Sequence, residues 1–185
     1  MENNMKIVIS GGPCSGKTSV VKKFKKKGYY TLPEPARILG EELGIKFSNE
    51  IRGKKRFEIN NLVFEKYLEQ ETRIPKNKIV ILDTGMPDNI PYYFLYCSGM
   101  EIPEKYLKAC ENRYNKVFML IPLNSYETDG VRGENKKEAS TIHRMKDKTY
   151  KELGYTVTPV PLFSKNKEES INKRVEFIER EIKQG

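Results

Sequence analysis

The clearest chemical signal in the chain is a short stretch that follows the apolar run Met5–Ile9. It consists of Gly11, Gly12, Pro13, Cys14, Ser15, Gly16, Lys17 and Thr18, and it has the spacing G-x-x-x-x-G-K-[ST]. Glycines at the first and sixth positions allow a tight turn, because no Cβ crowds the backbone there. The backbone N–H groups of such a turn point inward, where they bind phosphate oxygens. We therefore predict a phosphate-binding loop between a strand and a helix.

The last two residues of this loop indicate which phosphates are bound. Lys17 is expected to reach the β- and γ-phosphates of a nucleotide, and the Thr18 hydroxyl to ligate Mg²⁺. The positive end of the helix that follows adds its field to the site. The chain lacks the [NT]-K-x-D sequence with which GTPases read guanine, so we expect adenine. The predicted cofactors are ATP and Mg²⁺.

Asp83 is the predicted partner of Thr18 at the magnesium ion. It follows the apolar run Ile79–Leu82 and therefore ends a buried strand. Aspartates at this place hold Mg²⁺ directly or through water in loop-containing nucleotide enzymes. The alternative is that Asp83 only caps a helix. Thr84 follows where many ATPases place a glutamate that activates water, which argues against ATP hydrolysis.

Glu34 is a second carboxylate at a predicted strand end. Pro33 and Pro35 flank it and hold it rigidly. We expect it opposite the γ-phosphate, where a carboxylate can take the proton of an acceptor hydroxyl. Arg37 shares its helix face and could contact Glu34 or an anionic ligand. The alternative is a capping glutamate beside a surface arginine.

Residues 124–150 are predicted to include a lid that closes over the phosphates. Arg132 is the arginine expected to stabilise the transferring phosphoryl group, and Arg144 is a weaker candidate. A plain surface loop is the alternative.

Two further groups of side chains are candidates of lesser weight. The aromatic residues of the segment 92–96 are expected to pack between helices rather than to stack on a planar acceptor. His143 is the only histidine of the chain and is assigned no role.

The elements that position these residues can be predicted from hydrophobic periodicity. Five strands are expected, at Met5–Ile9, Tyr29–Leu32, Lys78–Leu82, Val117–Ile121 and Tyr155–Val160. Helices are expected at Ser19–Lys27, Ala36–Leu43, Phe57–Arg73, Glu138–Leu153 and Glu168–Lys183, with a broken helical section over Asn89–Asn112. The segment Phe47–Arg56 is predicted to be irregular. Alternating strands and helices predict an α/β fold, with a parallel sheet covered on both faces.

Composition sets the remaining limits. A chain of 185 residues fits one domain, residues 1–185. Three cysteines without a C-x-x-C pair suggest neither disulfides nor zinc, and together with the short apolar N-terminus they predict a cytoplasmic protein without a membrane segment. The net charge of +9 raises the possibility of nucleic-acid binding, but a lysine-rich solvated surface is the favoured interpretation.

Several segments together resemble a known family. They are Gly11–Thr18, Leu32–Arg37, Leu82–Asp88, Asp129–Arg132 and Leu153–Tyr155. They resemble the AAA-type ATP-binding P-loop proteins that are related to the ribosylnicotinamide kinase domain of bacterial NAD regulators. The resemblance extends from Lys6 to about Ile178.

This resemblance implies the P-loop NTPase fold of the kinase type, with strand order 2-3-1-4-5. The segment around Glu34 is also similar to that of deoxynucleoside kinases, which implies that Glu34 is the base and Asp83 lies on the magnesium side. Glu34, Arg37 and Asp88 are assigned to the acceptor. Relatives usually place arginine after the strand-end aspartate, and this chain has Thr84.

The function predicted from the sequence is phosphotransfer from Mg·ATP to a small hydroxyl-bearing acceptor, such as a nucleoside. Lys17, Glu34, Asp83 and Arg132 are the predicted catalytic residues. An ATPase or nucleotide-dependent switch that acts on a protein or nucleic-acid partner is the alternative. The acceptor and the oligomeric state stay open.

Overall fold

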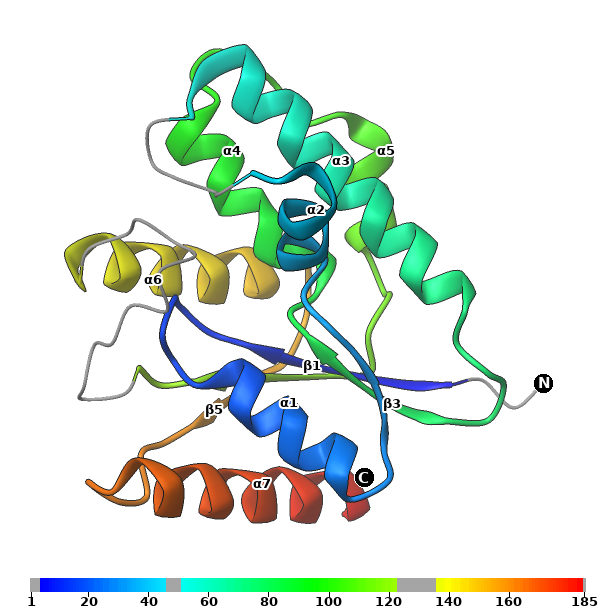
Figure 1. Cartoon of the computed structure of the whole chain (residues 1–185), viewed down its shortest axis with the longest axis vertical. Coiled ribbons are helices and arrows are strands. Elements are labelled where there is room, and N and C mark those ends of the chain that lie inside the picture. The colour runs from blue at the N-terminus through cyan, green and yellow to red at the C-terminus, as the bar shows by residue number, and fades with distance from the viewer. Residues whose placement is uncertain (1–3, 46–50, 123–135, 185) are drawn as a thin grey trace.

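The computed structural model describes residues 4–45, 51–122 and 136–184. Its centre is one five-stranded sheet in the order β2-β3-β1-β4-β5, in which every neighbouring pair is parallel (Figure 1). The strands are β1 (Met5–Ser10), β2 (Tyr30–Leu32), β3 (Ile79–Asp83), β4 (Lys116–Leu120) and β5 (Val157–Val160). The predicted strand order is confirmed.

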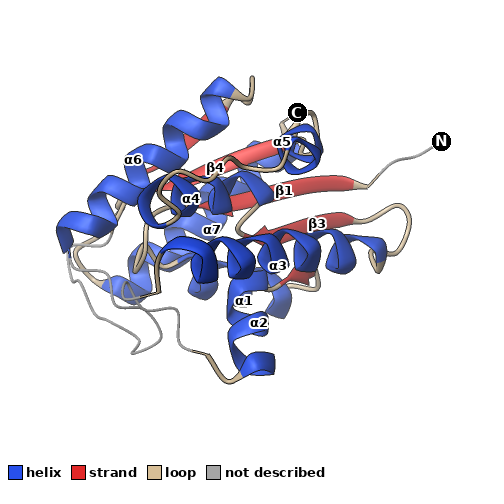
Figure 2. Ribbon diagram, turned by 90° about the horizontal axis from the view of Figure 1, so that it is seen from above, coloured by secondary structure: helices blue, strands red, loops and turns tan. Residues whose placement is uncertain are grey.

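Helices cover both faces of the sheet, as the alternating sequence predicts. They are α1 (Lys17–Lys26), α2 (Pro35–Leu43), α3 (Gly53–Thr72), α4 (Ile90–Tyr96), α5 (Glu104–Cys110), α6 (Lys136–Glu152) and α7 (Lys167–Lys183), with a 3-10 turn η1 (Met86–Asn89) before α4. Helices α1 and α7 lie on one face, and α3 to α6 lie on the other (Figures 1 and 2). The central strand shows why both faces are apolar. Ile7 and Ile9 belong to the core beneath α1 and α7, whereas Val8 belongs to the core on the opposite face.

Helix α3 begins earlier than the sequence predicts. The polar residues 53–56 were expected to be irregular, which is wrong, because α3 starts at Gly53. The added turn is stabilised by Arg56, which is buried and donates from Nε to Asn60 Oδ1 at 3.1 Å. Its guanidinium carbon also lies 4.9 Å from the ring centroid of Tyr96 and 5.4 Å from that of Tyr92. A long-range contact with α4 thus stabilises helix where the local sequence only weakly favours irregular structure.

The aromatic residues of α4 behave as predicted. Tyr92, Tyr93 and Tyr96 are buried, and only Phe94 is largely exposed, at 69%. Tyr93 packs against Phe57 and Phe64 of α3. These rings are part of the helix packing.

The parallel arrangement brings the candidate chemical residues to one edge of the sheet. Strand β3 lies between β1 and β2, with Ile9 in register with Asp83 and Leu32 in register with Leu82. The phosphate loop, Glu34 and Asp83 therefore follow three neighbouring strand ends. Ligands of open α/β sheets bind at this edge. None of the helices in the described ranges is long and apolar enough to cross a membrane.

Candidate nucleotide-binding site

The loop between β1 and α1 has the backbone of an anion cradle. Gly11, Cys14 and Gly16 have φ angles of +148°, +58° and +89°. A Cβ on Gly11 would lie 2.6 Å from Ser15 Oγ and 2.9 Å from the carbonyl oxygen of Leu120, so only glycine fits at the entrance to the loop. Gly16 is the N-cap of α1, and the first N–H groups of a helix lack partners within it. The loop therefore combines a tight glycine-containing turn with a helix N-terminus, which favours a phosphate group.

Lys17 lies across this loop. Its side chain is buried, and Nζ donates to the carbonyl oxygen of Gly12 at 2.9 Å. This bond holds the ammonium group beside the cradle before any ligand arrives. A phosphate oxygen could then accept from the Lys17 ammonium with little loss of side-chain entropy.

Thr18 and Asp83 meet as the sequence predicts. The Thr18 hydroxyl donates to Asp83 Oδ2 at 2.7 Å. The other carboxylate oxygen, Oδ1, is buried and has no hydrogen-bond partner among the described residues. Burial raises the pKa of Asp83, while the charges of Lys17 and Arg37 and the bond from Thr18 favour the ionised carboxylate.

This pair fits a divalent cation. A buried carboxylate oxygen without a partner costs free energy, and Mg²⁺ prefers oxygen ligands. Thr18 and Asp83 are the residues that would hold the ion, directly or through water. When bound, it would neutralise charge on the phosphate groups.

Glu34 and Arg37 lie at the end of the neighbouring strand β2. Glu34 is the N-cap residue of α2 and is 7% exposed, and Pro35 fixes the first helical position. Arg37 is half-buried, and its charge counteracts part of the rise that burial causes in the pKa of Asp83. Both residues therefore lie at the same edge of the sheet as Thr18 and Asp83.

Asp88 lies inside the protein rather than on an open surface. It is 2% exposed, and its carboxylate accepts from Ser10 Oγ at 2.7 Å, the Gly85 amide at 2.9 Å and Tyr150 OH at 2.5 Å. Lys146 Nζ pairs with Asp88 Oδ1 at 3.0 Å. Asp88 thus joins the end of β1, the turn η1 and helix α6. An acceptor that contacted Asp88 would have to displace one of these groups.

Helix α6 contributes contacts to the phosphate loop that the sequence analysis missed. His143 Nδ1 accepts from the Gly12 amide at 3.3 Å, and Lys146 Nζ donates to the Gly11 carbonyl at 3.4 Å. A Cβ on Gly12 would lie 2.8 Å from the Ala139 carbonyl oxygen, which shows how closely the helix packs on the loop. The spacing of His143, Lys146 and Tyr150, at intervals of three and four, places them on one helix face. That stripe is the signal that could have identified them.

The bond to His143 predicts a pH dependence of stability. The pKa of His143 is lowered, chiefly by burial and further by the charges of Lys146 and Lys17, against Asp147 and Asp88, which raise it. The unfolded chain then binds more protons near pH 6, since an ordinary histidine titrates at about 6.5. The contribution of His143 to the free energy of unfolding is fully present above that value. It is lost as pH falls from there through the lower pKa of the folded protein.

Urea unfolding of the wild type and His143→Gln at several pH values measures this effect. The free energy of unfolding should fall more steeply between pH 7.5 and 5.5 in the wild type. Because the chain has no other histidine, the two proteins share every other side chain that titrates in this range. Parallel pH profiles would contradict the prediction.

Thr84 has the most unusual backbone at the site. Its φ is +75°, which is rare for a β-branched residue. The side chain is buried and shares a hydrogen bond of 2.7 Å with Tyr67 OH. The residue after the strand-end aspartate therefore faces the core beneath α3.

The two predicted lid arginines lie in different parts of the chain. Arg132 lies outside the described residues. Arg144 lies on α6 and is exposed.

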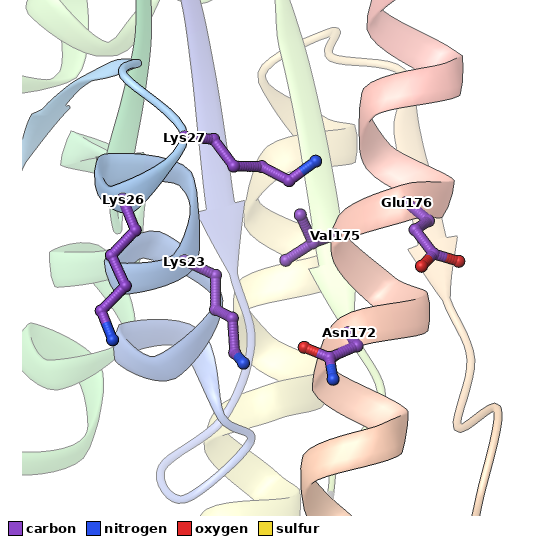
Figure 3. Close-up of a pocket in the computed structure, with 6 residues that line it drawn as sticks. All are labelled: Lys23, Lys26, Lys27, Asn172, Val175 and Glu176. Carbon is purple, nitrogen blue, oxygen red and sulfur yellow. The ribbon is translucent and has the colours of Figure 1, made fainter.

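A separate groove of about 290 Å³ lies between α1 and α7 (Figure 3). Lys23, Lys26 and Lys27 line it from the C-terminal half of α1, away from Lys17 at the start of that helix. Lys23 pairs with Glu168, and Lys27 pairs with Glu179. These lysines are compensated by acidic residues of α7, which favours the solvated-surface interpretation of the positive charge.

Comparison with known proteins places the chain in a family. The family model described as AAA domain matches residues 6–169, so the chain belongs to this family. No curated protein is similar enough in sequence to count as a match.

Solved structures show the same fold. NadR protein in complex with NR is 17% identical, with a TM-score of 0.72 over 96% of this chain and 51% of that chain. Thymidylate kinase from Ehrlichia chaffeensis is 17% identical, with a TM-score of 0.63 over 97% and 99%. Deoxyadenosine kinase from M. mycoides is 16% identical, with a TM-score of 0.62 over 98% and 100%. The present chain spans about half the length of the NadR chain. The fold is that of the P-loop kinases.

Proposed function

We propose that this protein transfers the γ-phosphoryl group of Mg·ATP to the hydroxyl of a small, nucleoside-like acceptor. The observation that carries the proposal is the meeting of three groups at one sheet edge. The phosphate loop with Lys17, the Thr18–Asp83 pair and the buried Glu34 follow adjacent strands. Phosphoryl transfer requires this combination of an anion cradle, a magnesium site and a base.

The roles follow from the chemistry of each group. The loop amides and Lys17 hold the triphosphate, and Thr18 and Asp83 hold the metal. Glu34 accepts the proton of the acceptor hydroxyl as that oxygen attacks the γ-phosphorus. Arg37, and Arg132 from the lid, stabilise the charge on the transferring group, and Asp88 fixes the inner wall of the acceptor site. NR bound to NadR and the product dCMP bound to deoxyadenosine kinase support a nucleoside-like acceptor.

ATP hydrolysis in response to a partner is the second candidate. Thr84 argues against hydrolysis, because the position after Asp83 holds no carboxylate that could activate water. Its hydroxyl is instead hydrogen-bonded to Tyr67 OH. The two candidates differ in one measurement, since a hydrolase releases phosphate without an added acceptor.

A thermal-shift screen should identify the acceptor. Nucleosides and related hydroxyl compounds would be added to the protein with magnesium and a non-hydrolysable ATP analogue. A true acceptor binds the folded state and raises Tm. Formation of its phosphorylated product from Mg·ATP would then confirm transfer. A chain that released only inorganic phosphate with every stabilising compound would contradict the proposal.

Glu34→Gln tests the assignment of the base. The variant keeps the shape of the side chain but cannot take a proton, so we expect kcat to fall by on the order of a hundredfold. The Kd for ATP should stay within about threefold, because the base serves the acceptor and not the phosphate cradle. Glu41→Gln, exposed on the same helix, is the control and should keep full activity. Equal rates in the three proteins would remove Glu34 from the mechanism.

A further inference from the structure

Arg174 on α7 is a fully buried guanidinium whose partners are all neutral. It is 0% exposed and donates to three backbone carbonyls, those of Ser15 at 2.8 Å, Ile121 at 2.6 Å and Pro161 at 3.1 Å. Ser15 belongs to the phosphate loop, and the other two residues directly follow β4 and β5. The described residues include no carboxylate that pairs with Arg174.

A buried cation without a carboxylate is costly to keep. Burial alone lowers the pKa of Arg174 to about 10, which shows that the surroundings disfavour its charge. The three hydrogen bonds to carbonyl oxygens offset part of this cost. A cation is useful, however, next to a site that receives several negative charges.

The hydrogen bond to Ser15 connects Arg174 to that site through one peptide group. In a planar trans peptide the C=O of Ser15 and the N–H of Gly16 point in opposite directions. Fixing the carbonyl toward Arg174 therefore aims the Gly16 amide away from Arg174, at the N-terminus of α1. A charged donor on the carbonyl also polarises the peptide and strengthens the amide as a donor.

We propose that Arg174 is a positioning residue for the triphosphate. It fixes the Ser15–Gly16 peptide with its N–H toward the phosphates, and its buried charge makes the cradle more favourable for an anion. Its two other bonds hold the loop against the chain segments that follow β4 and β5. The inference rests on the proposed function and deepens it, because it concerns how the same site binds its phosphate groups.

The test compares ligands that share phosphates but not a base. ATP and inorganic tripolyphosphate would be titrated calorimetrically into the wild type, Arg174→Gln and Arg174→Lys. Arg174→Gln should weaken both ligands by about tenfold, by the same factor for each. Arg174→Lys keeps the charge but lacks the forked geometry, so its loss should be smaller. Arg180→Gln is the control, because Arg180 lies on the same helix with its side chain 60% exposed, and it should bind as the wild type does.

The outcomes separate this inference from the proposed function. A purely structural role for Arg174 would lower Tm and leave both Kd values unchanged at a temperature where the variants are folded, which would overturn the inference. A loss for ATP alone would also overturn it, since the effect would not act through the phosphates. If Arg174→Gln does not fold, Arg174→Lys decides, and wild-type affinity for tripolyphosphate in that variant counts against the proposal. Failure of the wild type itself to bind either ligand would instead refute the proposed function.

Discussion

Lys17→Met is expected to weaken ATP binding by at least about a hundredfold while the fold is kept. The ammonium group provides charge-assisted hydrogen bonds to the phosphates, each contributing about 1.5–3 kcal/mol, and a hundredfold loss corresponds to about 2.7 kcal/mol. Methionine preserves most of the buried stem. The bond to the Gly12 carbonyl is lost with the ammonium group, so urea unfolding should be measured beside the titration to show that the variant is folded. Calorimetric titration with Mg·ATP measures the affinity directly.

The control for this prediction is Lys22→Met, an exposed lysine of the same helix. It removes one positive charge from the surface and should leave the Kd nearly unchanged. If both variants bound ATP equally well, the ammonium of Lys17 would not contact phosphate. The assignment of residues 11–18 as the cradle would then be wrong.

Asp88→Asn is expected to destabilise the protein by about 3–5 kcal/mol. The substitution removes the carboxylate charge that pairs with the buried Lys146 ammonium, which is 1% exposed. It also replaces an acceptor of the Ser10 and Tyr150 hydroxyls by a group that accepts on one side only. Urea unfolding followed by circular dichroism gives the free energy.

Two comparisons isolate the buried pair. The double variant Asp88→Asn, Lys146→Met should be less destabilised than the sum of the two single variants, because it removes the uncompensated charge. Asp147→Asn breaks an exposed i,i+4 pair with Lys151 on the same helix and should cost less than about 1 kcal/mol. An Asp88→Asn variant as stable as Asp147→Asn would show that the buried pair contributes nothing.

The site residues that could be predicted from the sequence are those defined by short-range spacing. Gly11, Gly16, Lys17 and Thr18 are defined by one motif, and the apolar run before Asp83 defines a strand end. Parallel topology then brings Thr18 and Asp83 together without further information, and in the structure the two side chains are hydrogen-bonded. Strand order could be predicted because it accompanies the motif in the kinase fold.

Residues that act through distant contacts could not be located in this way. His143 and Lys146 reach the loop from a helix more than 120 residues downstream, so only the packing of α6 reveals them. The start of α3 was misplaced for the same reason, since Arg56 is stabilised by the rings of α4. Asp88 follows the same sheet edge, but its burial depends on four groups from three parts of the fold: the end of β1, the start of η1 and helix α6.

The bond between Arg174 and Ser15 joins residues 159 positions apart. Contacts of such long separation form late, because much chain must be ordered before the two groups meet. During synthesis, residues 11–18 emerge long before α7, and until α7 folds the loop lacks the bond from Arg174. A nascent chain would therefore hold a completed motif in a weakened binding site, and ATP would stabilise the protein fully only after α7 had docked.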